Sequence, residues 1–144
     1  MDRSFAMTIG SDIAGIPAVS ERLEEGMGAC GFSLEDVLDT QLAVEEVITN
    51  IIVHGYQKPG SEIHLSGHFT RDRIEICITD TAPRFDPLSI PEPDLDSDIE
   101  ERRIGGLGIY LVRQVMDSLS YRYENGKNVL TMEKRRDPAL EKRT

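Results

Sequence analysis

A long helical repeat of apolar residues, within residues 32–56, constrains the fold more than any other feature of this chain. Its apolar side chains recur three and four positions apart, as on one face of an α-helix: Leu38, Leu42, Val44, Val47, Ile48, Ile51 and Ile52. Ser33 stands where a helix-capping residue is preferred, Asp36 follows in a variant of the capping box, and Gly55 marks the end. We therefore expect a long helix with one face toward the core.

Shorter patterns around this helix predict strands and two further helices. The alternating apolar residues of 61–70 and 74–80 indicate an antiparallel hairpin, and Asn125-Gly126 is typical of a tight hairpin turn. The predicted elements are strands at 4–9, 61–70 and 74–80, helices at 17–31, 32–56 and 107–117, and a hairpin within 118–135. Hairpins beside a few helices favour an α+β fold, a two-layer sandwich with a mainly antiparallel sheet and helices on one face.

The 144 residues are enough for one domain, which we place at residues 1–136, followed by a polar tail at 137–144. Residues 81–103 show no periodicity and hold four of the seven prolines, so we expect a long irregular segment that is a lid or binding loop, or is disordered. The sequence contains neither a long apolar run nor the apolar centre of a signal peptide. We therefore expect a cytoplasmic protein in which Cys30 and Cys77 are reduced and buried.

The formal net charge of −10 limits the ligands of this chain. Nonspecific nucleic-acid binding is disfavoured, because contacts to phosphates need Lys and Arg side chains. A phosphate ligand would have to be held by a metal ion or by backbone N–H groups.

Three short stretches are candidates for a functional site. In "GGLG" (105–108), glycines precede a predicted helix, so backbone N–H groups could approach a phosphate; a flexible hinge is the alternative. Glu46, Asn50 and His54 are spaced four residues apart on one helix face. Asn50 offers an oxygen suited to Mg²⁺, and Glu46 is a candidate general base toward a hydroxyl.

Each of these residues also has a structural alternative. Glu46 could belong to a solvated face, Asn50 could hydrogen-bond to backbone, and His54 could be a structural residue near a helix end. Asp80, at the end of an apolar strand, could accept a hydrogen bond from the amino group of adenine or form a turn.

The order of these stretches resembles that of the GHKL, or Bergerat-fold, ATPases. "AVEEVITNIIVHGY" (43–56) resembles the N box of that family, and "GGLGIYLVRQVMD" (105–117) resembles its second glycine box. Asp80 and the long loop lie between them in the same order, and the resemblance implies that residues 83–104 are the ATP lid. Over roughly residues 5 to 135 the chain is similar to the stand-alone branch, the RsbW-type anti-sigma-factor serine kinases.

The resemblance implies a role for each residue. Glu46 would activate a substrate serine, Asn50 would chelate Mg²⁺, and Asp80 would bind the adenine amine. The implied ATP-binding set is Asn50, His54, Asp80, Ala82, Phe85, Gly105, Gly106, Leu107 and Gly108. The chain departs from the family pattern in three places: Ala82 replaces the usual glycine of the first glycine box, "PRFDP" (83–87) stands where the broader superfamily has its next glycine, and Val129 stands where relatives often carry Thr.

The implied function is that of a regulator that binds Mg-ATP. It would phosphorylate a Ser or Thr of a STAS-type anti-sigma-factor antagonist and otherwise sequester a sigma factor, as a homodimer and without contacting nucleic acid or membrane. Three alternatives are a non-catalytic ATP-binding interaction module, a histidine kinase catalytic domain, and a structural domain with no nucleotide. None of His54, His64 and His68 lies in the pattern that histidine kinases use.

Overall fold

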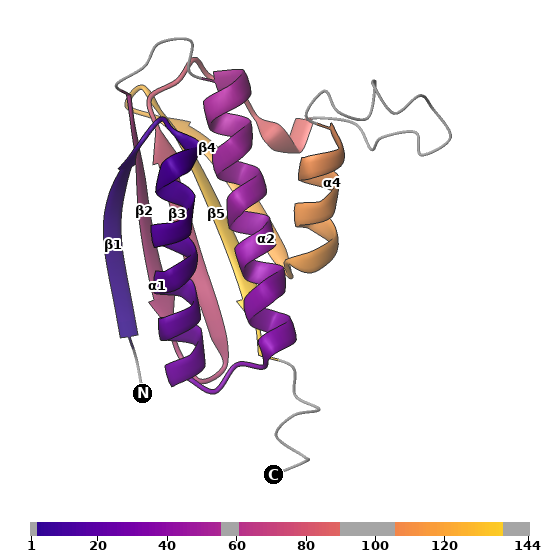
Figure 1. The fold of residues 1–144 in the computed structure, drawn as a ribbon. Helices are drawn as coiled ribbons and strands as arrows, with labels where there is room; N and C mark the ends of the chain where they lie inside the picture. Colours follow the sequence, from indigo (N-terminus) through magenta and orange to yellow (C-terminus); the bar gives the residue numbers. More distant parts are fainter. Residues whose placement is uncertain (1–2, 56–60, 90–105, 137–144) are drawn as a thin grey trace.

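The computed structural model describes residues 3–55, 61–89 and 106–136. Its described strands form one sheet in the order β1-β2-β3-β5-β4, with every neighbouring pair antiparallel. The strands are β1 (Arg3–Gly10), β2 (Glu62–Phe69), β3 (Arg73–Asp80), β4 (Ser118–Glu124) and β5 (Lys127–Arg135). The helices α1 (Ile16–Ala29), α2 (Leu34–Asn50) and α4 (Gly106–Val115) cover one face of this sheet (Figure 1). The predicted α+β sandwich is confirmed.

Local sequence signals fix several ends of these elements as expected. The Ser33 hydroxyl accepts a hydrogen bond from the Asp36 N–H at 3.1 Å, which caps α2. Pro17 stands in the first turn of α1, and Gly31 follows that helix with a φ of 86°. Asn125 and Gly126 have φ angles of 53° and 76°, as the two-residue turn between β4 and β5 requires.

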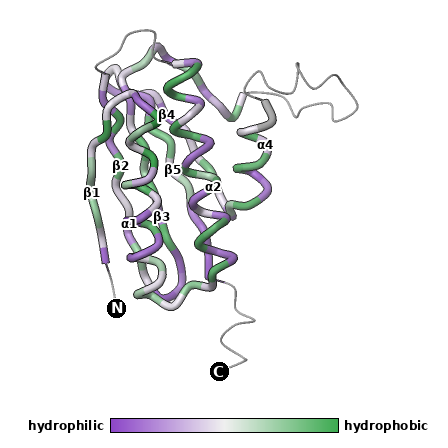
Figure 2. The backbone as a smooth tube through the Cα atoms, in the orientation of Figure 1, coloured by the Kyte–Doolittle hydropathy of each residue, from purple (hydrophilic) through white to green (hydrophobic). Residues whose placement is uncertain are grey.

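The hydrophobic core lies between the helices and the sheet. Along β2 and β3 every second residue is buried, including Ile63, Ile74 and Ile76, none of which is exposed to solvent. The helices carry both hydrophobic and hydrophilic residues (Figure 2), and Leu23 of α1 and Ile48 of α2 are among those buried. Alternation in the strands and helical periodicity thus turn their apolar sides toward one shared interior.

Two expectations about buried residues are wrong. Leu38 and Leu42 are 55% and 36% exposed, because the buried side of α2 is centred on Val44 and Ile48, and these leucines lie on its outer side. Cys77 is only half-buried, because it lies on the sheet face that the helices leave uncovered, whereas Cys30 is buried. Neither cysteine forms a disulfide, as expected.

The predicted helix at 32–56 changes character before its end. The α-helix stops at Asn50, and a π-helical turn, η2 (Ile51–Gly55), continues it. Of the predicted lid, only residues 83–89 are described, and they end in a short 3-10 helix, η3 (Pro87–Ser89). The predicted tail at 137–144 lies outside the described residues. In the part of the chain described here, no helix is both long and apolar enough to cross a membrane.

Candidate functional site

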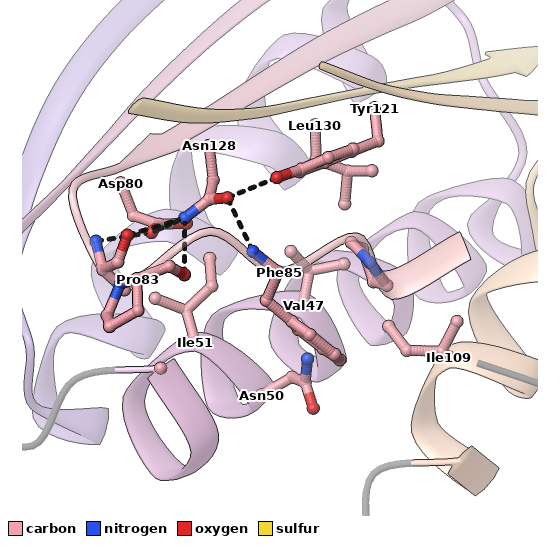
Figure 3. Close-up of a pocket in the computed structure, with 13 residues that line it drawn as sticks. Val47, Asn50, Ile51, Asp80, Pro83, Phe85, Ile109, Tyr121, Asn128 and Leu130 are labelled. Carbon is pink, nitrogen blue, oxygen red and sulfur yellow. Dashed lines mark hydrogen bonds between the residues drawn. The ribbon is translucent and has the colours of Figure 1, made fainter. Parts of the chain in front are cut away.

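A small pocket lies where α2, α4, the end of β3 and the start of β5 meet (Figure 3). Its cavity volume is about 40 Å³, and its lining is Val47, Asn50, Ile51, Gly55, Asp80, Ala82, Pro83, Phe85, Pro87, Ile109, Tyr121, Asn128 and Leu130. Most of these side chains are apolar. Phe85 extends across the pocket toward Asn50. The cavity is far smaller than the roughly 300–1,000 Å³ of ligand pockets, so a ligand would have to displace part of this lining.

Asp80 is the buried carboxylate of this pocket. It ends β3, is 5% exposed, and its Oδ1 accepts hydrogen bonds from the Ala82 N–H and from Asn128 Nδ2, both at 2.9 Å. Burial raises the pKa of Asp80, and the hydrogen bonds from Asn128 and Ala82 partly oppose this rise. When ionised, this carboxylate can only accept hydrogen bonds, which suits an amino group on a ligand.

Asn128 is a pocket residue that the sequence analysis missed. It stands opposite Asp80 in the β3–β5 register, and its Oδ1 accepts hydrogen bonds from the Phe85 N–H at 3.1 Å and from the Tyr121 hydroxyl. Tyr121, from β4, was missed as well. The signal for Asn128 was a polar residue two positions after the Asn125-Gly126 turn, but only the long-range pairing of β3 with β5 brings it to Asp80.

Val129, which the resemblance singled out, lies away from the pocket. It pairs with Thr79 on the uncovered face of the sheet, because successive residues of a strand point to opposite faces. The pocket-facing residue at this strand start is Asn128, one position earlier.

Ala82 and Phe85 both line the pocket, as expected. Ala82 is 4% exposed, and among the described non-glycine residues only Asn125 has a positive φ, so alanine fits this backbone without strain. A Cβ added to Gly55 would lie 3.1 Å from the Ala82 Cβ. The methyl group of Ala82 therefore takes up space that Gly55 leaves free.

Asn50 and Glu46 lie one helical turn apart on α2, and both are half-buried. Asn50 lines the pocket, and a Cβ added to Gly108 would lie 2.6 Å from Glu46 Oε2. Burial, together with the neighbouring charge of Glu45, raises the pKa of Glu46. The packing of α2 against α4 thus brings the expected general base to the expected glycine stretch.

The other expected site residues are His54, Gly105, Gly106 and Leu107. His54 is exposed and does not line the pocket. It lies in η2, where the wider π-helical turn takes it off the helix face that Glu46 and Asn50 share. Gly105 lies outside the described residues. Gly106 and Leu107 begin α4, so their backbone N–H groups lack partners within the helix.

No cluster of three or more His, Cys, Asp or Glu within 3–55, 61–89 and 106–136 could hold a metal ion by itself. Asn50 at the pocket edge offers a single amide oxygen. That donor fits Mg²⁺ bound mainly by ligand phosphates and water.

Comparison with known proteins identifies the class. The profile of the histidine kinase-like ATPase domain matches residues 9–134. Since this match spans most of the chain, the chain belongs to the histidine kinase-like ATPase domain family.

Particular relatives narrow this class. Serine-protein kinase RsbW of Listeria innocua is 33% identical over 105 residues, which are 69% of this chain and 67% of that protein. Serine-protein kinase RsbW of Halalkalibacterium halodurans is 34% identical over 108 residues, 72% of this chain and 65% of that protein. The chain thus spans about two thirds of the length of these relatives. They confirm the resemblance to RsbW-type serine kinases and support the expected enzyme class, a protein serine/threonine kinase.

The fold is also that of a solved structure. The crystal structure of the RsbU and RsbW domains of Rv1364c from Mycobacterium tuberculosis superposes with a TM-score of 0.66 at 14% sequence identity. The match covers 94% of this chain and 33% of that one. At this identity, the similarity establishes the shared fold.

Proposed function

We propose that this chain binds Mg-ATP in the Asp80 pocket and transfers the γ-phosphoryl group to a Ser or Thr hydroxyl of an anti-sigma-factor antagonist. The observation that carries the proposal is the convergence of three groups from distant parts of the sequence. The buried Asp80, Asn50 of α2 and Ile109 in the first turn of α4 line one cavity. Glu46, one helical turn before Asn50, lies beside this cavity against Gly108. The RsbW relatives support the same activity.

Asp80 would bind the adenine ring. Its carboxylate is an acceptor in an otherwise mostly apolar pocket, so it complements the amino group of the base while the apolar lining covers the ring. Phe85 would move off the pocket to admit it, since the present cavity of about 40 Å³ is too small.

The phosphates would lie at the start of α4. Backbone N–H groups of Gly106, Leu107 and Gly108, with Gly105 before them, would contact the phosphate oxygens, and the helix dipole favours negative charge there. Asn50 would hold Mg²⁺, which when bound neutralises phosphate charge and polarises the transferring group. Such a site lets a chain of net charge −10 bind a polyanion.

Glu46 would accept the proton of the attacking hydroxyl and orient that hydroxyl. Its raised pKa brings its basicity closer to neutral pH, which suits a general base. Phosphoryl transfer depends mainly on positioning and charge stabilisation, and Gly108 leaves the space in which this carboxylate lies.

The acceptor and the released partner are finer points of the same proposal. The acceptor would be a STAS-type antagonist, and the protein would sequester a sigma factor when the antagonist is phosphorylated. A homodimer and a cytoplasmic location remain predictions, as do the domain bounds 1–136.

The experiment is a phosphotransfer assay with radiolabelled ATP and a STAS-type antagonist from the same genome. Glu46→Gln should lower the transfer rate by about 10²–10⁴-fold while ATP binding persists. Glu45→Gln is the matched control on the adjacent, exposed position and should transfer at neutral pH like the wild type. ATP binding without transfer in the wild type would instead favour the non-catalytic interaction module.

A further inference from the structure

The side-chain amide of Asn128 joins three separate parts of the pocket. Its Nδ2 donates to Asp80 Oδ1 of β3 at 2.9 Å, and its Oδ1 accepts from the Phe85 N–H at 3.1 Å and from the Tyr121 hydroxyl of β4 (Figure 3). Asn128 is only 7% exposed. One buried group therefore links the candidate base-binding carboxylate, the loop that covers it, and the neighbouring strand.

The neighbours of this amide allow only one orientation. Nδ2 also lies 3.0 Å from the Ala82 carbonyl oxygen and 3.3 Å from that of Pro83, and carbonyl oxygens can only accept. On the other side, the Phe85 N–H can only donate. A flipped amide would place oxygen against oxygen and N–H against N–H, so Asn128 must present its donor to Asp80.

This orientation determines what Asp80 offers to a ligand. Two donors, from Asn128 and from the Ala82 backbone, point at Oδ1 and favour the ionised carboxylate inside an apolar pocket. An ionised carboxylate accepts from the 6-amino group of adenine but meets another acceptor at the 6-oxo group of guanine. Loss of the Asn128 donor would favour a protonated Asp80, which can donate to either base.

We propose that Asn128, held in place by Tyr121, is a positioning residue that maintains the preference of this pocket for an amino-bearing purine. This inference rests on nucleotide binding at Asp80, as proposed above. Because the same amide holds the Phe85 backbone, it also fixes the start of the loop that covers the base.

Asn128→Asp tests the proposal with a nearly isosteric change. It places a second carboxyl about 2.9 Å from Asp80 Oδ1, at the distance of the present bond, and the two acids must then share a proton. With one proton shared the introduced acid still donates to Asp80; when that proton leaves, the pair repels. The other titratable or charged groups near the pair are the neutral Tyr121 hydroxyl of β4 and the charged Arg84 and Asp86 of the loop. The helical side of the lining is Val47 and Asn50 of α2, Ile51 of η2 and Ile109 of α4, none of which is titratable.

We expect ATP affinity of this variant to fall by about tenfold or more from pH 6 to pH 8.5, while that of the wild type does not fall. The ratio of ATP to GTP affinity should also decrease, measured by calorimetric titration with both nucleotides. If Asn128 only stabilised the fold, its substitution would lower the affinities for ATP and GTP by the same factor.

Tyr121→Phe is a milder second variant and removes only the hydroxyl. It should weaken ATP binding by about threefold to tenfold, and the matched control Tyr123→Phe, two residues along β4, should not. The Cζ atom of Arg84 lies 5.4 Å from the centre of the Tyr123 ring, and Tyr123 does not line the pocket. Hydrogen exchange on the nucleotide-free protein should show faster exchange of the Phe85 amide in Tyr121→Phe and Asn128→Asp.

The outcomes separate this inference from the proposed function. Wild-type binding of ATP together with an unchanged ATP-to-GTP ratio and pH profile in Asn128→Asp would overturn the inference and leave the proposed function standing. If the wild type binds neither nucleotide, both are wrong. Should Asn128→Asp fail to fold, Tyr121→Phe decides: affinity and Phe85 exchange equal to those of Tyr123→Phe would contradict the positioning role.

Discussion

The Glu46 carboxylate of α2 lies where a side chain on Gly108, in the first turn of α4, would otherwise be. A Cβ at residue 108 would lie 2.6 Å from Glu46 Oε2, so the carboxylate has its position only because residue 108 lacks a side chain. This relationship gives the glycine stretch a second role beside phosphate binding, because it also positions the expected general base.

Gly108→Ala should therefore impair transfer without unfolding the chain. The new methyl group displaces the flexible Glu46 carboxylate, and a misplacement of about 1 Å in a catalytic group costs on the order of a hundredfold in rate. Gly28→Ala is the control, since a Cβ there meets nothing within 4 Å. Transfer rates and circular dichroism of both variants are the measurement; equal transfer rates in the two would refute the role of Gly108.

As the pH is lowered, the transfer rate should begin to fall at a higher pH than it would if the general base had the pKa of an ordinary glutamate. Glu46 acts when ionised, and burial and the Glu45 charge raise its pKa above that of an ordinary glutamate. Activity is therefore lost as pH falls through this raised pKa. Glu45→Gln removes the second cause and should move the acid limb to lower pH, whereas an unmoved limb would argue against Glu46 as the titrating base.

The same pKa shift predicts an effect on stability. A carboxyl whose pKa is raised by folding favours the native state below its unfolded pKa, and this contribution is lost as pH rises through the folded pKa. Ionised Glu46 thus destabilises the native protein at neutral pH. Thermal unfolding of Glu46→Gln at pH 7 should show a Tm equal to or above that of the wild type, and a clearly lower Tm would contradict the burial argument.

Lys134 should contribute to stability through its contacts with two helices. Its Nζ donates to the Val115 carbonyl oxygen at the end of α4 at 2.6 Å and lies 3.9 Å from Asp36 Oδ1 of α2. Asp36 is 7% exposed, and among the described residues its Oδ2 has no hydrogen-bond partner. Lys134→Met should therefore cost about 1–3 kcal/mol in urea unfolding. Adding Asp36→Asn should recover part of this loss; strictly additive effects would show that the pair does not interact.

Two glycines of α1 form a matched test of packing. A Cβ at Gly26 would lie 2.5 Å from the Phe69 ring, whereas one at Gly28 meets nothing within 4 Å. Gly26→Ala should destabilise the protein by about 1–3 kcal/mol, since it overpacks the core. Gly28→Ala should stabilise it by about 0.5–1 kcal/mol through helix propensity. The same sign of change in both would contradict the packing of α1 on β2.

Much of this fold could be predicted from local patterns. Ser33, Gly31 and the Asn125-Gly126 turn act on neighbouring backbone, and the alternation of Ile74 and Ile76 sets the buried face of β3. The prediction for Leu38 and Leu42 was wrong because the apolar residues of 32–56 cover more of the helix surface than the one face that packs against the core. Only tertiary packing decides which of them are buried.

The site was predictable only in part, for the same physical reason. Glu46, Asn50, Asp80 and Ala82 stand within recognisable stretches, and the structure places them around the pocket or beside it. Asn128 reaches Asp80 through a strand pairing across 48 residues of sequence, which no local pattern encodes. The prediction for His54 assumed a regular α-helix, and the π-helical turn at 51–55 moves His54 off the face of Glu46 and Asn50.

The central claim is that ATP binds at Asp80 with the help of Mg²⁺. The most direct measurement is calorimetric titration of the wild type and of Asp80→Asn with ATP, with and without Mg²⁺. The account predicts Mg²⁺-dependent binding by the wild type and a loss of about tenfold to a hundredfold in affinity in Asp80→Asn, which cannot present the same charged acceptor. Equal ATP affinities for the two proteins, or no binding by the wild type at millimolar ATP, would contradict it.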